Sequence, residues 1–157
     1  MGDLLVPLYK LETKPVPEVD SSIQIQRPLA ADRHVVVEWV REHFSERWAS
    51  ETGIAFSSQP VRCFVALDRE NRLVGFACYD VAWKGFFGPT GVAPDARNRG
   101  IGSVLLRRSL EAMKEAGYAY AIIGGSGVDA YYEKSVGAIP IPDSSPGAYR
   151  EWIQKDS

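Results

Sequence analysis

Between residues 91 and 103 the chain reads Gly91-Val92-Ala93-Pro94-Asp95-Ala96-Arg97-Asn98-Arg99-Gly100-Ile101-Gly102-Ser103. An apolar, β-rich run ends inside this stretch, and a helical pattern of apolar residues continues from Gly102 to Ala116. Glycines at such a junction let a ligand approach the backbone, and the unpaired N–H groups of a first helical turn attract phosphate. The stretch therefore predicts a strand–loop–helix corner, which is either the site of a pyrophosphate-bearing ligand or a plain turn with solvated arginines.

Two common nucleotide-binding fingerprints do not occur in the chain. Gly100-Ile101-Gly102 continues as Ser103-Val104-Leu105, so the third glycine of the dinucleotide pattern is missing, and neither Gly-Lys-Ser nor Gly-Lys-Thr occurs. Four arginines nevertheless crowd into one short stretch: Arg97, Arg99, Arg107 and Arg108. We expect these side chains to form a local positive mouth for one phosphorylated cofactor.

The composition is that of one ordinary globular domain. The chain has 157 residues, 45% of them hydrophobic, with 18 Lys and Arg against 20 Asp and Glu. Proteins that bind nucleic acid through its phosphates normally carry a basic excess. Nucleic acid is therefore not an expected partner.

Cysteine usage and the N-terminus predict a cytoplasmic protein. Cys63 and Cys78 are single residues inside apolar runs, with no His at metal spacing, as expected for buried thiols in a reducing cytosol. Residues 1–6 lack the cationic start and long apolar core of a signal peptide, and no apolar run is long enough to span a bilayer. We expect no metal site, no membrane partner and a cytoplasmic location.

Outward from the corner, hydrophobic periodicity predicts a mixed α/β (α+β) order of elements. Strands are expected at 22–27, 61–67, 73–81, 86–92, 118–123 and 138–141, helices at 32–44, 102–116 and 128–136, and a short helix or loop at 45–59. Residues 1–21 are expected to form an N-terminal extension, with an edge strand over the apolar run that contains Pro7. Residues 22–157 are then a single domain.

The corner and a later segment together resemble a known family. Val92-Ala93-Pro94 followed by Arg97-Asn98-Arg99-Gly100-Ile101-Gly102 is similar to the acetyl-CoA signature of the GNAT superfamily of N-acetyltransferases. Tyr132-Glu133-Lys134 with Gly137-Ala138 is similar to a later family segment, and the element order agrees from Ser22 to about Ile141. The resemblance implies a mixed, mostly antiparallel sheet of about six to seven strands, flanked by about four helices and splayed between the fourth and fifth strands.

The same resemblance implies a site for acetyl-CoA as cosubstrate. Backbone groups of Gly91 and Val92 would receive the pantetheine arm, the amides from Asn98 to Ser103 would hold the pyrophosphate, and Arg97 stands at the family's Arg/Gln position. The implied cofactor-binding residues are Gly91, Val92, Arg97, Asn98, Arg99, Gly100, Ile101, Gly102 and Ser103.

The reaction implied by the resemblance is direct transfer of an acetyl group to a primary amine of a small molecule or peptide, within a ternary complex. Tyr132 is the implied catalytic acid for the departing thiolate, and the Val92 N–H is the implied donor to the oxyanion. Tyr132 stands five residues before Gly137, where the family has four, so Tyr131 is a second candidate for the acid. The base stays open among Asp80, Glu38, His34, His43 and a chain of water molecules.

Several further expectations concern the acceptor side. The family layout implies an acceptor pocket near five aromatic residues that are otherwise core residues: Phe44, Trp48, Trp83, Phe86 and Phe87. Residues 124–127 are a mobile loop or an ordinary turn, and residues 143–147 with Tyr149 and Arg150 are a lid or an anion contact. Because the tail is short, the last strand of the sheet is expected to form with help from residues 1–12.

Two functional hypotheses of different class stay open. The first is an acetyl-CoA-dependent N-acetyltransferase, monomeric or homodimeric. The second is a module of the same fold that binds acyl-CoA as a sensor, or binds a partner, without catalysis. The Tyr132 position and the complete stretch from Arg97 to Gly102 favour the enzyme, whereas the lack of an identifiable base favours the module.

Overall fold

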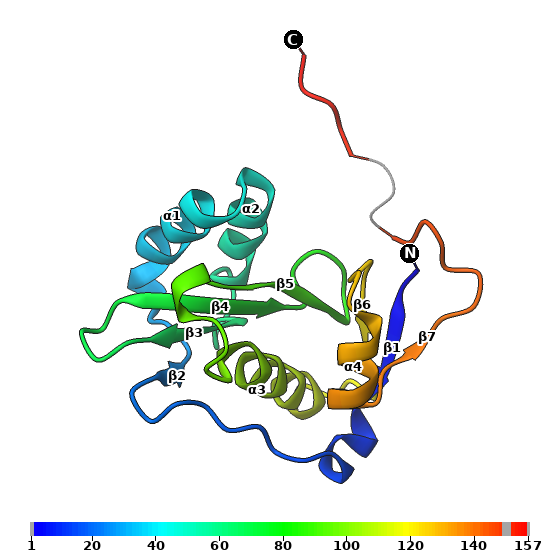
Figure 1. Ribbon diagram of the computed structural model, residues 1–157. Coiled ribbons are helices and arrows are strands. Elements are labelled where there is room, and N and C mark those ends of the chain that lie inside the picture. The colour runs from blue at the N-terminus through cyan, green and yellow to red at the C-terminus, as the bar shows by residue number, and fades with distance from the viewer. Residues whose placement is uncertain (1, 149–151, 157) are drawn as a thin grey trace.

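The computed structural model describes residues 2–148 and 152–156 and contains one seven-stranded sheet in the order β2-β3-β4-β5-β6-β1-β7 (Figure 1). The strands are β1 (Leu4–Pro7), β2 (Gln24–Gln26), β3 (Cys63–Leu67), β4 (Leu73–Tyr79), β5 (Phe86–Val92), β6 (Tyr120–Ile123) and β7 (Ile139–Pro140). Neighbouring strands are antiparallel except β5 and β6, which are parallel. The expected mixed, mostly antiparallel α/β architecture is confirmed.

Helices cover both faces of this sheet. The α-helices are α1 (Arg33–His43), α2 (Glu46–Ala55), α3 (Ile101–Glu115) and α4 (Asp129–Val136), with 3-10 turns at Leu8–Thr13, Ala30–Asp32 and Pro94–Ala96. Helices α1 and α2 lie on one face, and α3 and α4 lie on the other (Figure 1). Each pair closes its own apolar cluster, around Phe76 and Val40 on the first face and around Leu105 and Met113 on the second. The predicted helices at 32–44, 102–116 and 128–136 are thus present within a few residues.

The N-terminal strand β1 lies inside the sheet, between β6 and β7, and not at the edge that the sequence suggested. It pairs with β6 over its whole length, whereas β7 pairs only with Leu4 and Leu5. Pro7 therefore lies beyond the reach of β7, where its missing N–H costs no ladder hydrogen bond. The prediction that residues 1–12 help to form the last strand of the sheet is confirmed, because β7 pairs with Leu4 and Leu5 of β1.

After the first 3-10 turn, residues 14–22 run along the outside of α3 to reach β2 at the opposite edge of the sheet (Figure 1). We call this segment the strap. Arg107 of α3 donates hydrogen bonds to the carbonyls of Lys14 and Pro15 at 3.2 and 3.3 Å, and the Asp20 N–H donates to the carbonyl of Arg99 at 3.1 Å. The strap thus leads from the side of the sheet that holds β1 to the edge strand β2, and it is bonded to α3 near its start and to the loop before α3 near its end.

Strand β5 separates from β6 and carries an extra residue. Only Phe86 and Phe87 of β5 pair with β6, so the rest of the strand diverges and the sheet is splayed there, as expected. The pairing of β5 with β4 shifts between Phe87 and Thr90, because three steps along β5 face two steps along β4. This β-bulge contains Gly88. Because of it, the side chains of Phe87 and Thr90, which would face opposite sides in a regular strand, face the same side of the sheet.

Ser45 begins helix α2, since its side chain accepts a hydrogen bond from the Trp48 N–H at 3.1 Å. Replacing Ser45 with Ala is expected to lower the free energy of unfolding by about 1 kcal/mol, because it leaves that amide without its capping partner. Urea-induced unfolding measures the loss. Asp32→Ala is the matched control at α1, where the Asp32 side chain makes no capping hydrogen bond and a smaller loss is expected. Equal losses in both variants would contradict the assignment of Ser45.

Candidate active site

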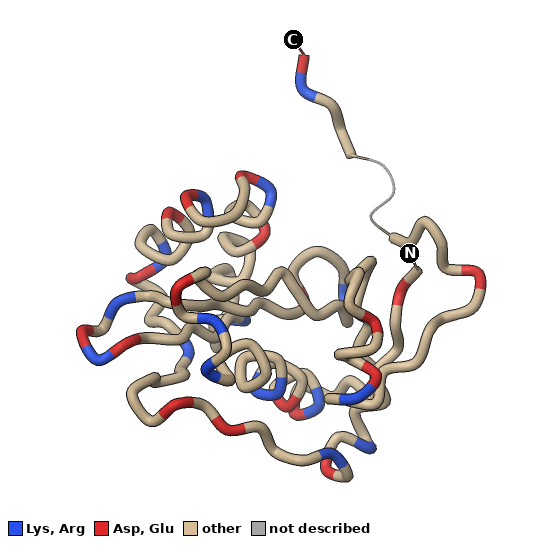
Figure 2. The backbone as a smooth tube through the Cα atoms, viewed as in Figure 1, with Lys and Arg blue, Asp and Glu red and all other residues tan. Residues whose placement is uncertain are grey.

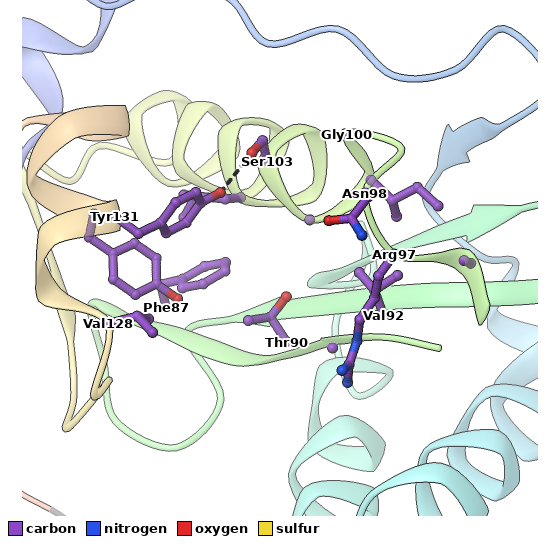
Figure 3. A pocket seen from close by; sticks show the side chains of 15 residues that line it. Phe87, Thr90, Val92, Arg97, Asn98, Gly100, Ser103, Val128 and Tyr131 are labelled. Carbon is purple, nitrogen blue, oxygen red and sulfur yellow. Dashed lines mark hydrogen bonds between the residues drawn. The ribbon is translucent and has the colours of Figure 1, made fainter. Parts of the chain in front are cut away.

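The splay beside β5 opens into a cavity of about 740 Å³, within the range of small-molecule sites (Figure 3). Its walls come from β5, the loop after it, the start of α3 and the start of α4, in the order Phe87, Thr90, Gly91, Val92, Ala96, Arg97, Asn98, Gly100, Ile101, Gly102, Ser103, Leu106, Val128, Tyr131 and Tyr132. Of the predicted cofactor-binding residues and the two candidate catalytic tyrosines, all but Arg99 line this one cavity. None of the lining side chains is acidic.

The loop before α3 curls so that the helix begins facing the cavity. Asn98 and Gly100 both have positive φ, 66° and 81°, and Gly100 is the N-cap residue of α3. The N–H groups of Ile101, Gly102 and Ser103 occupy the first helical turn, where no intrahelical carbonyl can accept from them. These amides and the positive end of the helix dipole point to an anionic group as the ligand of this end of the cavity.

The strand end at Gly91 lies between the cavity and α1–α2. A Cβ on Gly91 would collide with the ring of Phe44, which packs over this strand from the opposite face. On the cavity side, a Cβ on Gly102 would lie 3.8 Å from the Val92 side chain, an ordinary contact. Glycine is therefore required at residue 91 by packing, whereas residue 102 has room for a methyl group.

The predicted positive mouth of four arginines is wrong for three of them. Arg99 donates to the Ser22 hydroxyl at 2.6 Å, Arg107 binds the strap carbonyls and Glu111, and Arg108 donates to the Ile25 carbonyl at 3.4 Å. Arg97 alone among the four lines the cavity. The sequence of the loop and α3 reveals the cations but not the hydroxyl and carbonyl groups of the strap and β2 that the fold brings against them.

Two adjacent tyrosines of α4 line the cavity in different ways. Tyr131 is 41% exposed, and its hydroxyl lies 2.7 Å from the Ser103 hydroxyl, a hydrogen bond that joins α4 to α3 (Figure 3). Tyr132 is only 8% exposed, and among the described residues its hydroxyl has no hydrogen-bond partner. Burial, with a smaller contribution from Tyr131, raises the pKa of Tyr132 to about 12. Tyr132 therefore stays protonated at neutral pH with its hydroxyl available to a ligand.

None of the side chains considered as a base lines the cavity. The Asp80 carboxylate accepts from the Tyr118 hydroxyl at 2.8 and 2.9 Å and from the Gly85 N–H at 2.7 Å, which ties the β4–β5 turn to the chain before β6. Glu38 pairs with Arg41 at 2.5 Å, and His43 stacks on Trp39. Asp80, Glu38 and His43 are therefore each engaged outside the cavity.

The aromatic residues expected at the acceptor side divide between core and surface. Phe44 and Trp48 pack on Phe76 with ring centroids 5.6 and 6.1 Å away, so they belong to the α1–α2 cluster. Phe87 lines the cavity, and Trp83 is 54% exposed. These positions favour the core interpretation for Phe44 and Trp48.

The sequence left open whether the loop before α4 is mobile or an ordinary turn, and whether the segment after α4 forms a lid or an anion contact. Ser126 accepts from the Val128 N–H and donates to Asp129, so residues 124–127 form a turn that leads into α4. Farther along, Trp152 lies under the Arg47 guanidinium, 4.1 Å from ring centroid to carbon. Tyr149 and Arg150, considered as part of a lid, lie outside the described residues.

The sequence analysis did not identify four cavity residues as site residues: Thr90, Ala96, Leu106 and Val128. Thr90 faces the cavity on the same side as Phe87 because of the bulge in β5. The signal that could have revealed it is Gly88-Pro89, a pair that interrupts a strand pattern and commonly marks a bulge. Leu106 lies on the helical face predicted as core, and nothing in its pattern separates a cavity wall from a packed core.

Over the described residues, no helix is long and apolar enough to cross a membrane, and no group of His, Cys, Asp and Glu side chains could hold a metal ion.

Comparison with known proteins agrees with this geometry. A model of the acetyltransferase (GNAT) family matches residues 33–138. A GCN5-related N-acetyltransferase from Sphaerobacter thermophilus superposes with a TM-score of 0.71 at 23% identity, over 89% of this chain and 48% of that one. One from Kribbella flavida gives 0.63 at 16% identity, over 88% and 53%. A GNAT acetyltransferase from Brucella melitensis, solved with acetyl-CoA, gives 0.55 at 17% identity, over 80% and 92%.

This chain spans about half the length of the Sphaerobacter and Kribbella proteins. No curated protein sequence matches it. At these identities the solved structures show a shared fold, whereas the family model covers the strand–loop–helix corner, the cavity and both tyrosines. The chain belongs to the GNAT family of acetyltransferases.

Proposed function

We propose that the protein transfers an acetyl group from acetyl-CoA to a primary amine of a small molecule or peptide, directly and within a ternary complex. The observation that carries the proposal is the single cavity that brings together the open edge of β5, the amide-lined start of α3 and a buried tyrosine of α4. A family match alone supports acetyl transfer, and the amine acceptor is the further step proposed here.

The residues fit the cosubstrate along its length. The end of β5 at Gly91 and Val92, which is paired with β4 but open toward β6, is proposed to offer backbone groups to the amide-bearing pantetheine arm. The amides from Asn98 to Ser103 fit the pyrophosphate, and Arg97 supplies the cation beside it. Bound there, acetyl-CoA supplies an activated thioester.

Chemistry at the thioester needs an oxyanion donor, an acid and a base. The Val92 N–H is the proposed donor, since β5 is unpaired toward β6 at that point. Tyr132 is the proposed acid, because its hydroxyl is protonated and, among the described residues, unbonded. The base is proposed to be water. Asp80, which the sequence offered, is held by Tyr118 and Gly85.

A cytoplasmic location and a monomeric or homodimeric state complete the proposal. Cys63 and Cys78 are both free and buried, which fits a reducing compartment.

Two measurements test the function. Acetyl-CoA at a hundredfold excess over its Kd is expected to stabilise the protein by about 2.7 kcal/mol, seen as a rise in thermal midpoint. Free-thiol release is then followed over a panel of amines, and release with at least one amine is expected. Stabilisation without release by any amine would favour the non-catalytic acyl-CoA-binding module, for which the absence of a base in the cavity is the supporting observation. Absence of stabilisation would contradict both.

The raised pKa of Tyr132 predicts an unusual alkaline pH profile. The acid works in its protonated form, and a folded-state pKa of about 12 preserves that form to higher pH than the ordinary value of 10.0. We therefore expect kcat/KM for acetyl-CoA to stay level up to about pH 10.5, where an unshifted phenol would already be mostly ionised. Initial rates at saturating acceptor give the profile. A decline centred near pH 10 or below would contradict the role of Tyr132.

A further inference from the structure

We infer that the strap, through Asp20 and Ser22, positions the loop that binds the cofactor pyrophosphate. The inference rests on the proposed function, because it assigns positioning residues to the proposed acetyl-CoA site. Neither residue lines the cavity, so both act through Arg99 and the backbone beside it. The strap is then part of the binding machinery, although it lies some eighty residues before the loop in sequence.

Arg99 is held by the strap through three contacts. Its guanidinium donates to the Ser22 hydroxyl at 2.6 Å and lies 3.5 Å from the Asp20 carboxylate, and its carbonyl accepts from the Asp20 N–H at 3.1 Å. Side chain and backbone of one loop residue are therefore both fixed by two strap residues.

The strap end that holds Arg99 is itself ordered. Asp20 accepts from both the N–H and the hydroxyl of Ser22, at 2.8 and 2.7 Å. These hydrogen bonds, more than the charge of Arg99, lower the pKa of Asp20, so the carboxylate is ionised at neutral pH. The compact Asp20–Ser22 turn is thus a preformed receptor for one guanidinium and one carbonyl.

Contact continues at the next residue of the loop. The Glu18 carbonyl of the strap lies where a Cβ on Gly100 would stand, so the two backbones meet without an intervening side chain. Gly100 is the N-cap of α3, and the free amides of the first helical turn follow it directly. Any movement of the strap at this point therefore moves the groups proposed to bind the pyrophosphate.

Hydrogen bonds from α3 also hold the opposite end of the strap. Arg107, only 7% exposed, donates hydrogen bonds to the carbonyls of Lys14 and Pro15. Figure 2 shows acidic positions along the strap beside basic positions on α3.

A second cavity of about 390 Å³ lies between the strap, α3 and α4, and it shares Ser103, Leu106 and Tyr131 with the first cavity. The strap is therefore separated from the proposed cofactor site by a single layer of side chains.

The test uses the full chain with Asp20→Ala and Ser22→Ala combined, which removes both groups that hold the Arg99 guanidinium. We expect the Kd for CoA, measured by calorimetry, to rise about five- to tenfold, as the loss of one charged hydrogen bond and one exposed ion pair implies. In turnover, KM for acetyl-CoA rises while kcat stays within about twofold, because the reacting groups are untouched. In the free protein, amide hydrogen exchange over residues 97–104 becomes faster.

Glu12→Ala is the matched control, since it removes an ion pair between the N-terminal segment and α3 at the end far from the loop. It is expected to leave the Kd, KM and loop exchange unchanged. Should the double variant fail to fold, Ser22→Ala alone serves, with about half the effect on a logarithmic scale. Unchanged or tighter CoA binding together with unchanged loop exchange would overturn the inference. If wild-type protein does not bind CoA, the proposed function fails, and hydrogen exchange without ligand still decides whether the strap orders the loop.

Discussion

Gly100→Ala is expected to raise the Kd for CoA by more than about tenfold and to lower the free energy of unfolding by about 1–3 kcal/mol. Two physical effects add at this residue. Its φ of 81° is unfavourable for any residue with a Cβ, and the new methyl group would collide with the Glu18 carbonyl. Backbone cannot swing aside as a long side chain can, so either the strap or the start of α3 must shift. Calorimetry with CoA and urea-induced unfolding measure the two losses.

Two further glycine variants distinguish the effect of backbone strain from the effect of a collision with the strap. Gly117→Ala imposes a comparable strain, with φ of 105°, but its Cβ would meet nothing within 4 Å. It is expected to lose stability while binding CoA as the wild type does. Gly102→Ala places its Cβ 3.8 Å from Val92 and is expected to keep its stability. If Gly100→Ala binds CoA as tightly as Gly117→Ala, the close passage of the strap has no effect on the site.

The elements around the site could be predicted because their patterns are local. Strand β5 has the predicted bounds, and α3 begins within one residue of its expected start, since apolar spacing and a run of glycines mark both. Of the nine cofactor-binding residues that the GNAT signature implies, eight line the cavity, and Arg99 does not. A short motif sufficed there because its residues are contiguous, so that one strand end and the loop after it bring them to the same cavity.

The position of β1 and the role of the strap could not be predicted, because they depend on contacts between distant segments. The apolar run at Leu4–Pro7 identifies a strand. Its two neighbours in the sheet are β6 and β7, which lie more than a hundred residues later in the sequence. In the same way, the sequence suggests a phosphate site at Arg99, Arg107 and Arg108, whereas in the fold the strap and β2 supply their hydrogen-bond partners. The sequence shows where a cationic side chain stands, whereas only the fold shows which acceptor group binds it.

Tyr132→Phe is expected to lower kcat about a hundredfold while leaving the Kd for acetyl-CoA within about twofold, as the loss of a general acid implies. The ring of Tyr132 fills part of the cavity wall, and phenylalanine preserves that packing while removing only the hydroxyl. A change confined to turnover therefore reports on proton donation rather than on the shape of the site.

Tyr131→Phe is the matched variant, and the structure predicts a different outcome for it. Its hydroxyl is engaged by Ser103 at 2.7 Å, so its removal breaks a link between α4 and α3 instead of removing a free proton donor. We expect kcat to stay within about threefold of the wild type, with any loss appearing in KM for acetyl-CoA. Ser103→Ala breaks the same link from the other side and should reproduce the effect on kcat. Rapid-quench measurement of a single turnover separates chemistry from product release in all three variants. A hundredfold lower kcat in Tyr131→Phe, together with a wild-type rate of chemistry in Tyr132→Phe, would mean that Tyr131 is the general acid and Tyr132 is not. It would mean that Tyr131 leaves Ser103 when the cosubstrate enters, because its hydroxyl must then reach the thioester.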